Sequence, residues 1–231
     1  MNSINRTARI AGLLYFMYIV TSIVADLFGH FVFADAPATV NNMIAHESLF
    51  RIGFVISLFS YVFFLLAAWY LYVLLKPVNK NIALLFLILN LGGFAILVYS
   101  HLNLLSSLTL VSGADYLKVI QPEQLQAQAI LFINLYKTGS TIAQIPFGVW
   151  LLPLGYLVFK SGFLPKILGI FLIVDCFGLL LYVCQRFLLP GYAVIAYPCW
   201  AMGFIAEVSL TLWLLIKGVK DQKPALADGQ K

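Results

Sequence analysis

Charged residues are scarce in this sequence. Lys, Arg, Asp and Glu make up 10% of its 231 residues, whereas 62% are hydrophobic. A soluble globular domain carries about a quarter charged residues, so this chain has too little polar surface to cover a water-soluble globule. The low charge excludes an ordinary soluble domain and indicates that lipid solvates most of the exterior.

Alternation of apolar and polar residues with a period of two is also missing. Inside a bilayer the backbone must satisfy its own hydrogen bonds, which leaves helices and closed β-barrels as spanning structures. Barrel strands show short alternating segments, but the apolar runs here are long and continuous. The sequence therefore predicts an all-α polytopic membrane protein.

Cysteines are few, and the common catalytic motifs are absent. Cys176, Cys184 and Cys199 have no CxxC spacing, so we expect no zinc site. Cys184 and Cys199 both fall near the predicted outer face, where a disulfide can form, but two separate buried thiols are favoured. No GxSxG, HExxH, P-loop or GxGxxG motif is present, so we expect no metal, no cofactor and no catalytic residue of these classes.

A basic patch interleaved with aromatic residues is missing as well, which argues against nucleic acid as a partner. What the sequence does contain is six apolar runs, each long enough to cross a bilayer. Their expected ranges are about 8–28, 49–75, 82–112, 122–159, 167–188 and 199–216. We interpret residues 1–220 as a single transmembrane domain and residues 221–231 as a polar cytoplasmic tail.

The basic residues are unevenly distributed between the two ends of these spans. One side holds most of the 14 Lys and Arg residues: Arg6, Arg9, Lys76, Lys80, Lys160, Lys166, Lys217, Lys220, Lys223 and Lys231. The other side holds Arg51, Lys118, Lys137 and Arg186. Cytoplasmic loops of membrane proteins carry the excess of Lys and Arg. We therefore predict that both termini are cytoplasmic and that the longer connections face outward.

Polar side chains within the spans are the candidates for function, because charges are costly in hydrocarbon. At helical spacing they form one polar stripe on each of five spans, and Asp175 and Glu207 fall near the bilayer midplane. The candidate pocket residues are Asp26, His101, Lys137, Gln144, Asp175, Tyr182, Arg186 and Glu207. Against lipid these stripes would be unsatisfied, so we expect them to face inward and line a polar core or a cavity that widens outward.

Each candidate also has a structural interpretation. Asp175 and Glu207 can hold helices together through hydrogen bonds, or they can bind a proton, a cation or the ammonium group of a ligand. Lys137 and Arg186 can reach outer head groups or capture an anionic ligand. For His101, a hydrogen-bonded residue at a helix interface is favoured over a residue that binds a ligand.

Several segments carry a resemblance to a known family. They are RTARIAGLLY, LFRIG, KPVNK, EVSLTLWLLIKGVK and, above all, the central FGVWLLPLGYLVFKSGFLPKILG. Through these motifs the chain resembles the domain of unknown function 4386 family over essentially its whole length. The resemblance implies a six-helix bacterial integral membrane protein of the plasma membrane, and it implies no known reaction.

Three functions remain open from the sequence. The first, which we favour, is a non-enzymatic membrane protein whose outward-facing pocket binds or moves a small amphiphile, a lipid or an ion. The second is a membrane-embedded hydrolase that holds Asp175, Glu207 and His101 within about 6 Å of a metal or an activated water. The third is a structural or assembly partner whose polar stripes are packed shut. Membrane lipid surrounds the protein in each case, and the oligomeric state is left open.

Overall fold

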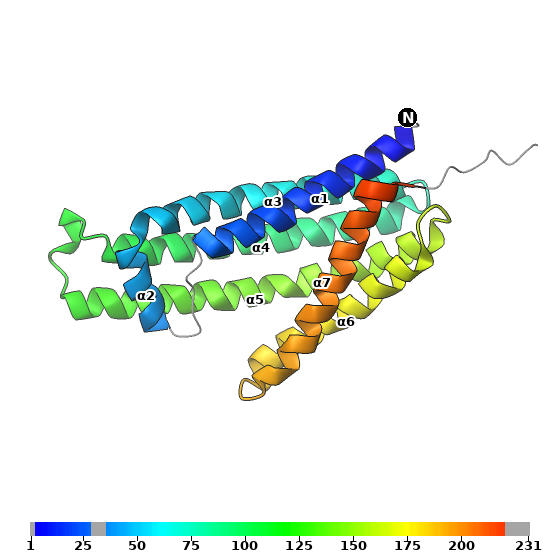
Figure 1. Cartoon of the computed structure of the whole chain (residues 1–231). Coiled ribbons are helices and arrows are strands. Elements are labelled where there is room, and N and C mark those ends of the chain that lie inside the picture. The colour runs from blue at the N-terminus through cyan, green and yellow to red at the C-terminus, as the bar shows by residue number, and fades with distance from the viewer. Residues whose placement is uncertain (1–2, 29–35, 220–231) are drawn as a thin grey trace, which may run out of the picture.

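The computed structural model describes residues 3–28 and 36–219, and it is built from helices (Figure 1). The long helices are α1 (Ser3–Phe28), α3 (Glu47–Leu75), α4 (Lys80–Val111), α5 (Pro122–Lys160), α6 (Lys166–Leu188) and α7 (Ala196–Leu212). The short elements are α2 (Ala36–Ala45), two 3-10 turns, η1 (Asp115–Leu117) and η2 (Ala193–Ile195), and the π-helical turn η3 (Trp213–Lys217). In all, 6 helical segments are long and apolar enough to cross a membrane, which confirms the predicted class and number of spans. The tail predicted at 221–231 lies outside the described residues.

Local signals in the sequence set several helix ends. The Asn79 side-chain oxygen accepts hydrogen bonds of 3.1 Å from the backbone N–H groups of Asn81 and Ile82, which caps the start of α4. Gly113 follows α4 with a φ of 72°, a conformation that favours glycine and ends helices. Pro122 occupies the first turn of α5, where its missing N–H costs no hydrogen bond.

The long helices form a ring in which each packs against two neighbours. The order around the ring is α1, α3, α4, α5, α6 and α7, and α7 returns to α1. The first four of these run alongside one another, whereas the α6–α7 hairpin crosses them at an angle and diverges from them toward one end (Figure 1). We call the junction between α1 and α7 the seam. At the seam the α6–α7 hairpin meets the bundle of the other four long helices, and the hairpin leaves this bundle toward one end (Figure 1).

The two ends of the ring differ in charge. The start of α1, the end of α7 and the α3–α4 and α5–α6 turns lie together at one end (Figure 1). The described charged residues there are Arg6, Arg9, Lys76, Lys80, Lys160, Lys166 and Lys217, and no described Asp or Glu accompanies them. We call this the basic end, and the opposite end, which holds α2, η1 and η2, the outer end. The placement of the basic end in the cytoplasm stays a prediction.

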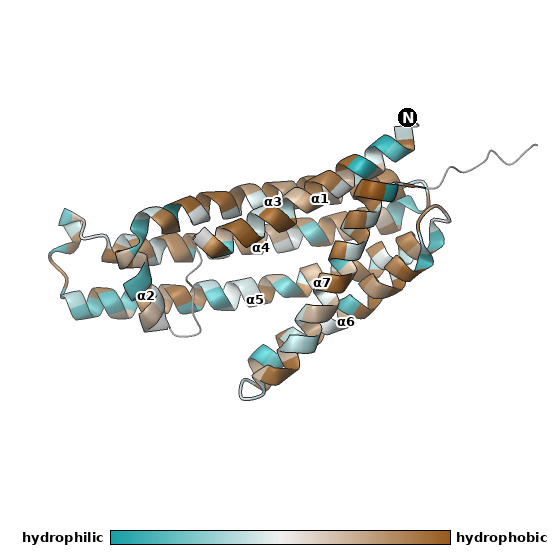
Figure 2. Ribbon diagram, viewed as in Figure 1, coloured by the Kyte–Doolittle hydropathy of each residue, from teal (hydrophilic) through white to brown (hydrophobic). Residues whose placement is uncertain are grey.

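The outside of the ring is apolar along the middle of the helices and polar at the two ends (Figure 2). Large apolar side chains are exposed there, including Phe59 at 60% and Phe177 at 61%. A soluble monomer rarely exposes so much contiguous apolar surface. In a bilayer this surface meets lipid, so the exposed apolar side chains mark the lipid-facing side of the spans.

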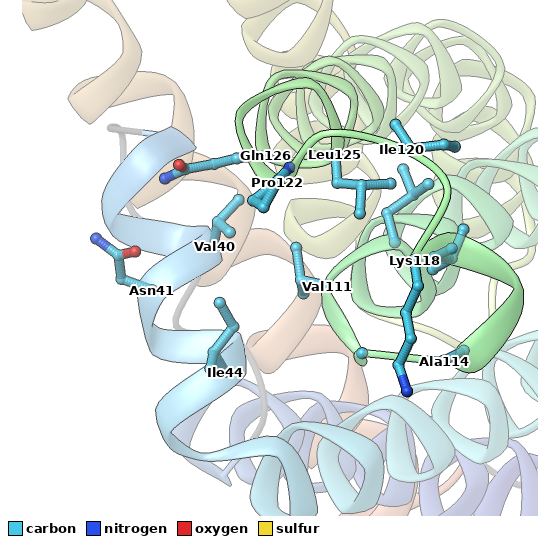
Figure 3. Close-up of a pocket in the computed structure, with 13 residues that line it drawn as sticks. Val40, Asn41, Ile44, Val111, Ala114, Lys118, Ile120, Pro122, Leu125 and Gln126 are labelled. Atoms are coloured by element: carbon cyan, nitrogen blue, oxygen red, sulfur yellow. The ribbon is translucent and has the colours of Figure 1, made fainter.

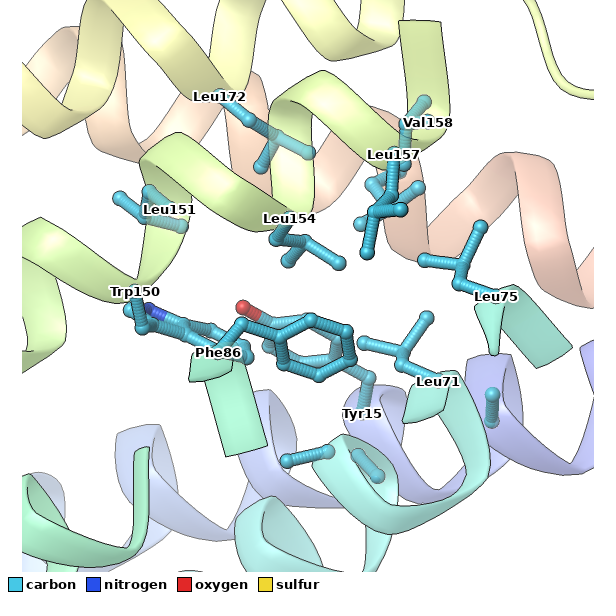
Figure 4. Packing of buried hydrophobic residues seen from close by; sticks show 14 of the residues in the cluster. Tyr15, Leu71, Leu75, Phe86, Trp150, Leu151, Leu154, Leu157, Val158 and Leu172 are labelled. Atoms are coloured by element: carbon cyan, nitrogen blue, oxygen red, sulfur yellow. The ribbon is translucent and has the colours of Figure 1, made fainter. Parts of the chain in front are cut away.

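The larger of the two clusters of buried apolar residues lies toward the basic end. Trp150 packs edge-on against Phe64 and Phe86, with ring centroids 5.4 and 6.0 Å apart, and Tyr15 and Leu71 complete the same cluster (Figure 4). A smaller cluster lies at the outer end and comprises Val40, Met43, Phe50, Leu104, Leu108, Ala129 and Ile133. Polar residues of the spans lie between these two packed regions.

Candidate functional site

A cavity of about 590 Å³ lies at the seam between α1 and α7. Its polar lining comes from four helices and consists of Tyr18 and Ser22 on α1, Gln144 on α5, Asp175 on α6, and Trp200 and Glu207 on α7. The remainder of the wall is apolar and includes Leu179, Phe204 and Val208. A concave space with an apolar wall and a few converging polar groups is the usual form of a small-molecule site.

The seam is closed on the basic side of this cavity. A Cβ added to Gly12 of α1 would meet the backbone nitrogen of Leu215 at 2.6 Å and the Cβ of Leu214 at 2.9 Å, so the two backbones touch there. The cavity residues of α1 and α7 therefore lie between this close contact and the outer end.

Asp175 is the most deeply buried ionisable group of the cavity. Its exposed fraction is 0%, and neither carboxyl oxygen has a hydrogen-bond partner among the described residues. Gly203 on α7 leaves the room that the carboxyl group occupies, because a Cβ at position 203 would meet Asp175 Oδ1 at 3.0 Å. A buried carboxyl group without a partner is costly, so Asp175 is the leading candidate for a ligand-binding group in this cavity.

Glu207 faces the same space from α7 and is half-buried. Asp175 and the hydroxyl groups of Tyr15 and Tyr18 are its electrostatic neighbours. The buried Tyr15 hydroxyl approaches the Glu207 carboxyl group from α1. The two acids thus share one polar region, with phenol groups of α1 on its far side.

Gln144 and Tyr182 complete this side of the site in different ways. Gln144 lines the cavity, and its Nε2 donates a long hydrogen bond of 3.5 Å to the Ser140 carbonyl. The Tyr182 ring contacts the Trp200 ring edge-on, with centroids 4.8 Å apart and planes at 61°. Tyr182 therefore supports the aromatic wall from behind instead of lining the cavity.

His101 lies in a separate polar cluster between α3, α4 and α5. It is buried, and the Tyr61 hydroxyl lies 2.9 Å from its Nε2. The rings of Tyr61 and Tyr136 both approach the imidazole edge-on, each with a centroid distance of 5.0 Å. No group of three His, Cys, Asp or Glu residues that could hold a metal ion occurs among the described residues. The structure therefore does not assemble His101 with Asp175 and Glu207 as the hydrolase hypothesis requires.

The other candidates lie toward the outer end. Asp26 is exposed one helical turn beyond Ser22, Lys137 is half-buried on α5, and Arg186 is exposed at the end of α6. None of these three side chains lines the cavity. The cysteines are free, with Cys184 exposed and Cys199 buried, so the described chain contains no disulfide between them. The site is thus centred on Gln144, Asp175 and Glu207.

Sequence reasoning missed the contribution of α3. Its Ser60 hydroxyl lies 2.6 Å from the Ser22 hydroxyl and donates a hydrogen bond of 3.1 Å to the Tyr18 carbonyl, which fixes the cavity side of α1. Tyr61 on the same helix pairs with His101. The only signal was the Ser57–Tyr61 spacing of one helical turn, which predicts a polar face on this span.

A second cavity, of about 540 Å³, lies at the outer end between α2, the end of α4 and the start of α5 (Figure 3). Apolar side chains such as Val40, Val111 and Leu125 surround it, and Lys118 stands at its edge. The Lys118 ammonium is already paired with Asp115 at 2.6 Å. This cavity holds none of the predicted site residues and has no buried polar group directed into it, so the seam cavity is the better candidate.

Comparison with known proteins gives two similarities. The sequence matches the family described as "Domain of unknown function (DUF4386)" over residues 10–218. It is also 31% identical over 150 residues, 65% of this chain and 74% of the relative, to a protein of Archaeoglobus fulgidus described as an uncharacterized protein. No solved structure matches the chain. The resemblance drawn from the sequence motifs is therefore confirmed.

Proposed function

Because this chain belongs to the DUF4386 family, whose description assigns no reaction, we propose its function from the geometry of a multi-pass membrane protein. The protein binds, and thereby carries or senses, a small amphiphile or ion in the seam cavity. We place it in the plasma membrane with its basic end in the cytoplasm, so that the cavity lies on the outer side of the contact at Gly12. The single observation that carries this proposal is the buried Asp175 carboxyl group without a hydrogen-bond partner.

The energetic argument compares a structural role with a binding role. A carboxyl group that held helices together would accept or donate hydrogen bonds to neighbouring side chains, because a buried polar group without partners costs about 1–3 kcal/mol. Asp175 has no such bond in the described chain, and it belongs to the wall of the cavity. A ligand that supplies the missing interaction recovers this cost when it binds.

The apolar part of the wall supports an amphiphile. Leu179 and Val208 line the cavity beside the acids. At the mouth, Ile23 is 50% and Phe204 is 63% exposed on the side that meets lipid. A molecule with one polar and one apolar part is able to enter sideways from the membrane and to place its polar part at the acids.

The rival functions have less support. The hydrolase hypothesis needs His101 beside the two acids, whereas His101 is engaged with Tyr61 on another side of the bundle. A closed assembly partner needs tightly packed polar stripes, whereas the polar residues of α1, α5, α6 and α7 line a cavity of about 590 Å³. Neither rival accounts for the position of Asp175.

Native mass spectrometry of protein extracted with its own lipids tests the proposal. We expect the wild-type protein to retain a small molecule that Val208→Trp, which fills the cavity, loses. Val55→Trp is the matched control, because Val55 is 48% exposed on α3 and does not line the cavity. An empty wild-type protein, or the same adduct in Val208→Trp, would overturn the proposal.

A further inference from the structure

We infer that the occupant of the seam cavity is an organic cation, a lipophilic ammonium group attached to an apolar body. This inference rests on the proposed function, since it names the chemical class of the ligand for the same cavity. Three observations carry it: the sign of the charges that line the cavity, the unsatisfied state of Asp175, and the aromatic wall.

The ionisable residues of the cavity are all acids. Asp175 from α6 and Glu207 from α7 face the same space, and among the described residues that line it there is no Lys, Arg or His. An anionic head group would meet two carboxyl groups with no compensating cation, which is unfavourable at short range in a low-dielectric site. A cation would be attracted by the carboxylate form of either acid.

The two acids do not satisfy each other, because Asp175 makes no hydrogen bond to Glu207. The exposed fraction of Asp175 is 0%, and both of its oxygens lack hydrogen-bond partners in the described chain. On α7, Gly203 lies against the carboxyl group and has no side chain to offer. An ammonium group placed in the cavity would give the carboxyl group a charged hydrogen-bond partner, which none of the described residues that line the cavity supplies.

The wall beside the acids is aromatic. Tyr18, Trp200 and Phe204 line the cavity, and the contact with Tyr182 fixes the Trp200 ring. Aromatic faces within about 6 Å attract a cation through the ring quadrupole, and this is how proteins recognise quaternary ammonium groups. The same rings accept the apolar body of an amphiphile, so the wall fits both parts of a lipophilic ammonium ion.

An inorganic ion fits the cavity less well. Calcium takes about six to eight oxygen ligands and magnesium needs a tight octahedron, whereas the cavity offers two carboxyl groups, one amide, one serine hydroxyl and one tyrosine hydroxyl within a largely apolar wall. No metal-holding cluster occurs in the part of the chain that the structure describes. A volume of about 590 Å³ also exceeds what one ion fills, and it lies within the range of organic ligand sites.

The test uses three probes of one shape and different charge. They are benzyltrimethylammonium, its neutral carbon isostere neopentylbenzene, and benzylsulfonate as the anion. Binding is measured by equilibrium dialysis against the purified full chain in nanodiscs of phosphatidylcholine, with empty nanodiscs subtracted. We expect the cation to bind at least tenfold more tightly than either other probe.

Variants connect that preference to the residues. Asp175→Asn should weaken binding of the cation by about 10- to 100-fold and leave binding of the neutral isostere unchanged. Trp200→Leu removes the aromatic face without touching a carboxyl group and should also weaken the cation selectively. Glu123→Gln, which removes an exposed acid at the outer end, is the matched control and should change nothing.

The outcomes separate this inference from the proposed function. Equal binding of the cation and the isostere, or preferred binding of the sulfonate, overturns the cationic class and leaves a binding pocket in place. Absence of binding by all three probes overturns the cationic class as well, and native mass spectrometry then decides whether the pocket holds another ligand. If Asp175→Asn fails to fold, Trp200→Leu alone decides, and unchanged selectivity in that variant overturns the inference.

Discussion

The carboxyl group of Asp175 on α6 rests against Gly203 on α7, so that a Cβ added at position 203 would meet its Oδ1 at 3.0 Å and its Cγ at 3.6 Å. This contact joins the two helices of the diverging hairpin at the point where the cavity begins. It also means that the position of the carboxyl group depends on the absence of a side chain from the facing helix.

Gly203→Ala should displace the carboxyl group of Asp175 and weaken ligand binding. A contact of 3.0 Å is too short for an ordinary Cβ neighbour, so the acid must move by a few tenths of an ångström or α7 must shift. We expect binding of a cationic probe to fall several-fold, while the unfolding temperature measured in detergent changes little.

Gly178→Ala provides the control for that variant. It adds a Cβ at 3.9 Å from the same Oδ1 and at 3.7 Å from Cys199 Cα, which are ordinary van der Waals distances. Binding should stay at the wild-type level. A loss of binding in Gly178→Ala as large as that in Gly203→Ala would show that the hairpin tolerates no added methyl group and that the specific contact is unimportant.

Gly155→Ala should destabilise the bundle at the crossing of α5 and α6. A Cβ at position 155 would meet the Gly169 carbonyl oxygen at 2.7 Å and the Ile173 nitrogen at 3.1 Å, and backbone atoms yield less readily than side chains. Overpacking of this kind costs about 1–3 kcal/mol, which thermal unfolding of the detergent-solubilised protein would detect. Gly92→Ala, with nothing within 4 Å of its added Cβ, should be neutral or slightly stabilising; equal effects of the two changes would contradict the close crossing.

Tyr61→Phe should reduce stability without affecting ligand binding. The change removes the hydroxyl group that lies 2.9 Å from His101 Nε2, and the loss of one such hydrogen bond costs about 0.5–1.5 kcal/mol. Tyr99→Phe on α4 is the control, because Tyr99 is 69% exposed. Loss of binding with unchanged stability in Tyr61→Phe would instead place the His101 cluster in the functional site.

The orientation of the chain is open to a direct measurement. In a variant whose three cysteines are replaced by alanine, Val119→Cys should react with a membrane-impermeant maleimide in intact cells, because Val119 is 89% exposed at the outer end. Asn81→Cys, at the exposed basic end of α4, should react only after the membrane is permeabilised. The reverse pattern would place the basic end outside and contradict the positive-inside prediction.

The spans could be predicted because their signals are local. A run of apolar residues fixes a span by its own transfer free energy, and caps such as Asn79 and stops such as Gly113 act within one turn. The inward direction of Asp175 and Glu207 followed from the cost of placing acids against lipid. These inferences need no knowledge of which helices are neighbours.

The grouping of the site residues could not be predicted, because it depends on tertiary contacts. The rotation of α4 against α5 is fixed by contacts such as Phe147 on Gly93, where an added Cβ would lie 2.6 Å from the ring. That rotation directs His101 away from the acids. The role of Phe204 was equally invisible, because one aromatic residue among so many apolar ones gives no signal until the cavity that it lines is known.

One consequence of the fold concerns α5, which runs for 39 residues from Pro122 at the outer end to Lys160 at the basic end. At 1.5 Å per residue it is about 58 Å long, nearly twice the roughly 30 Å thickness of the hydrocarbon layer. The outer portion of α5 therefore extends beyond the hydrocarbon layer, and the same helix carries Gln144 at the cavity wall, next to the interior proline Pro146. A single helix thus connects the second cavity at the outer end, which Pro122 and Leu125 line, with the seam cavity, which Gln144 lines.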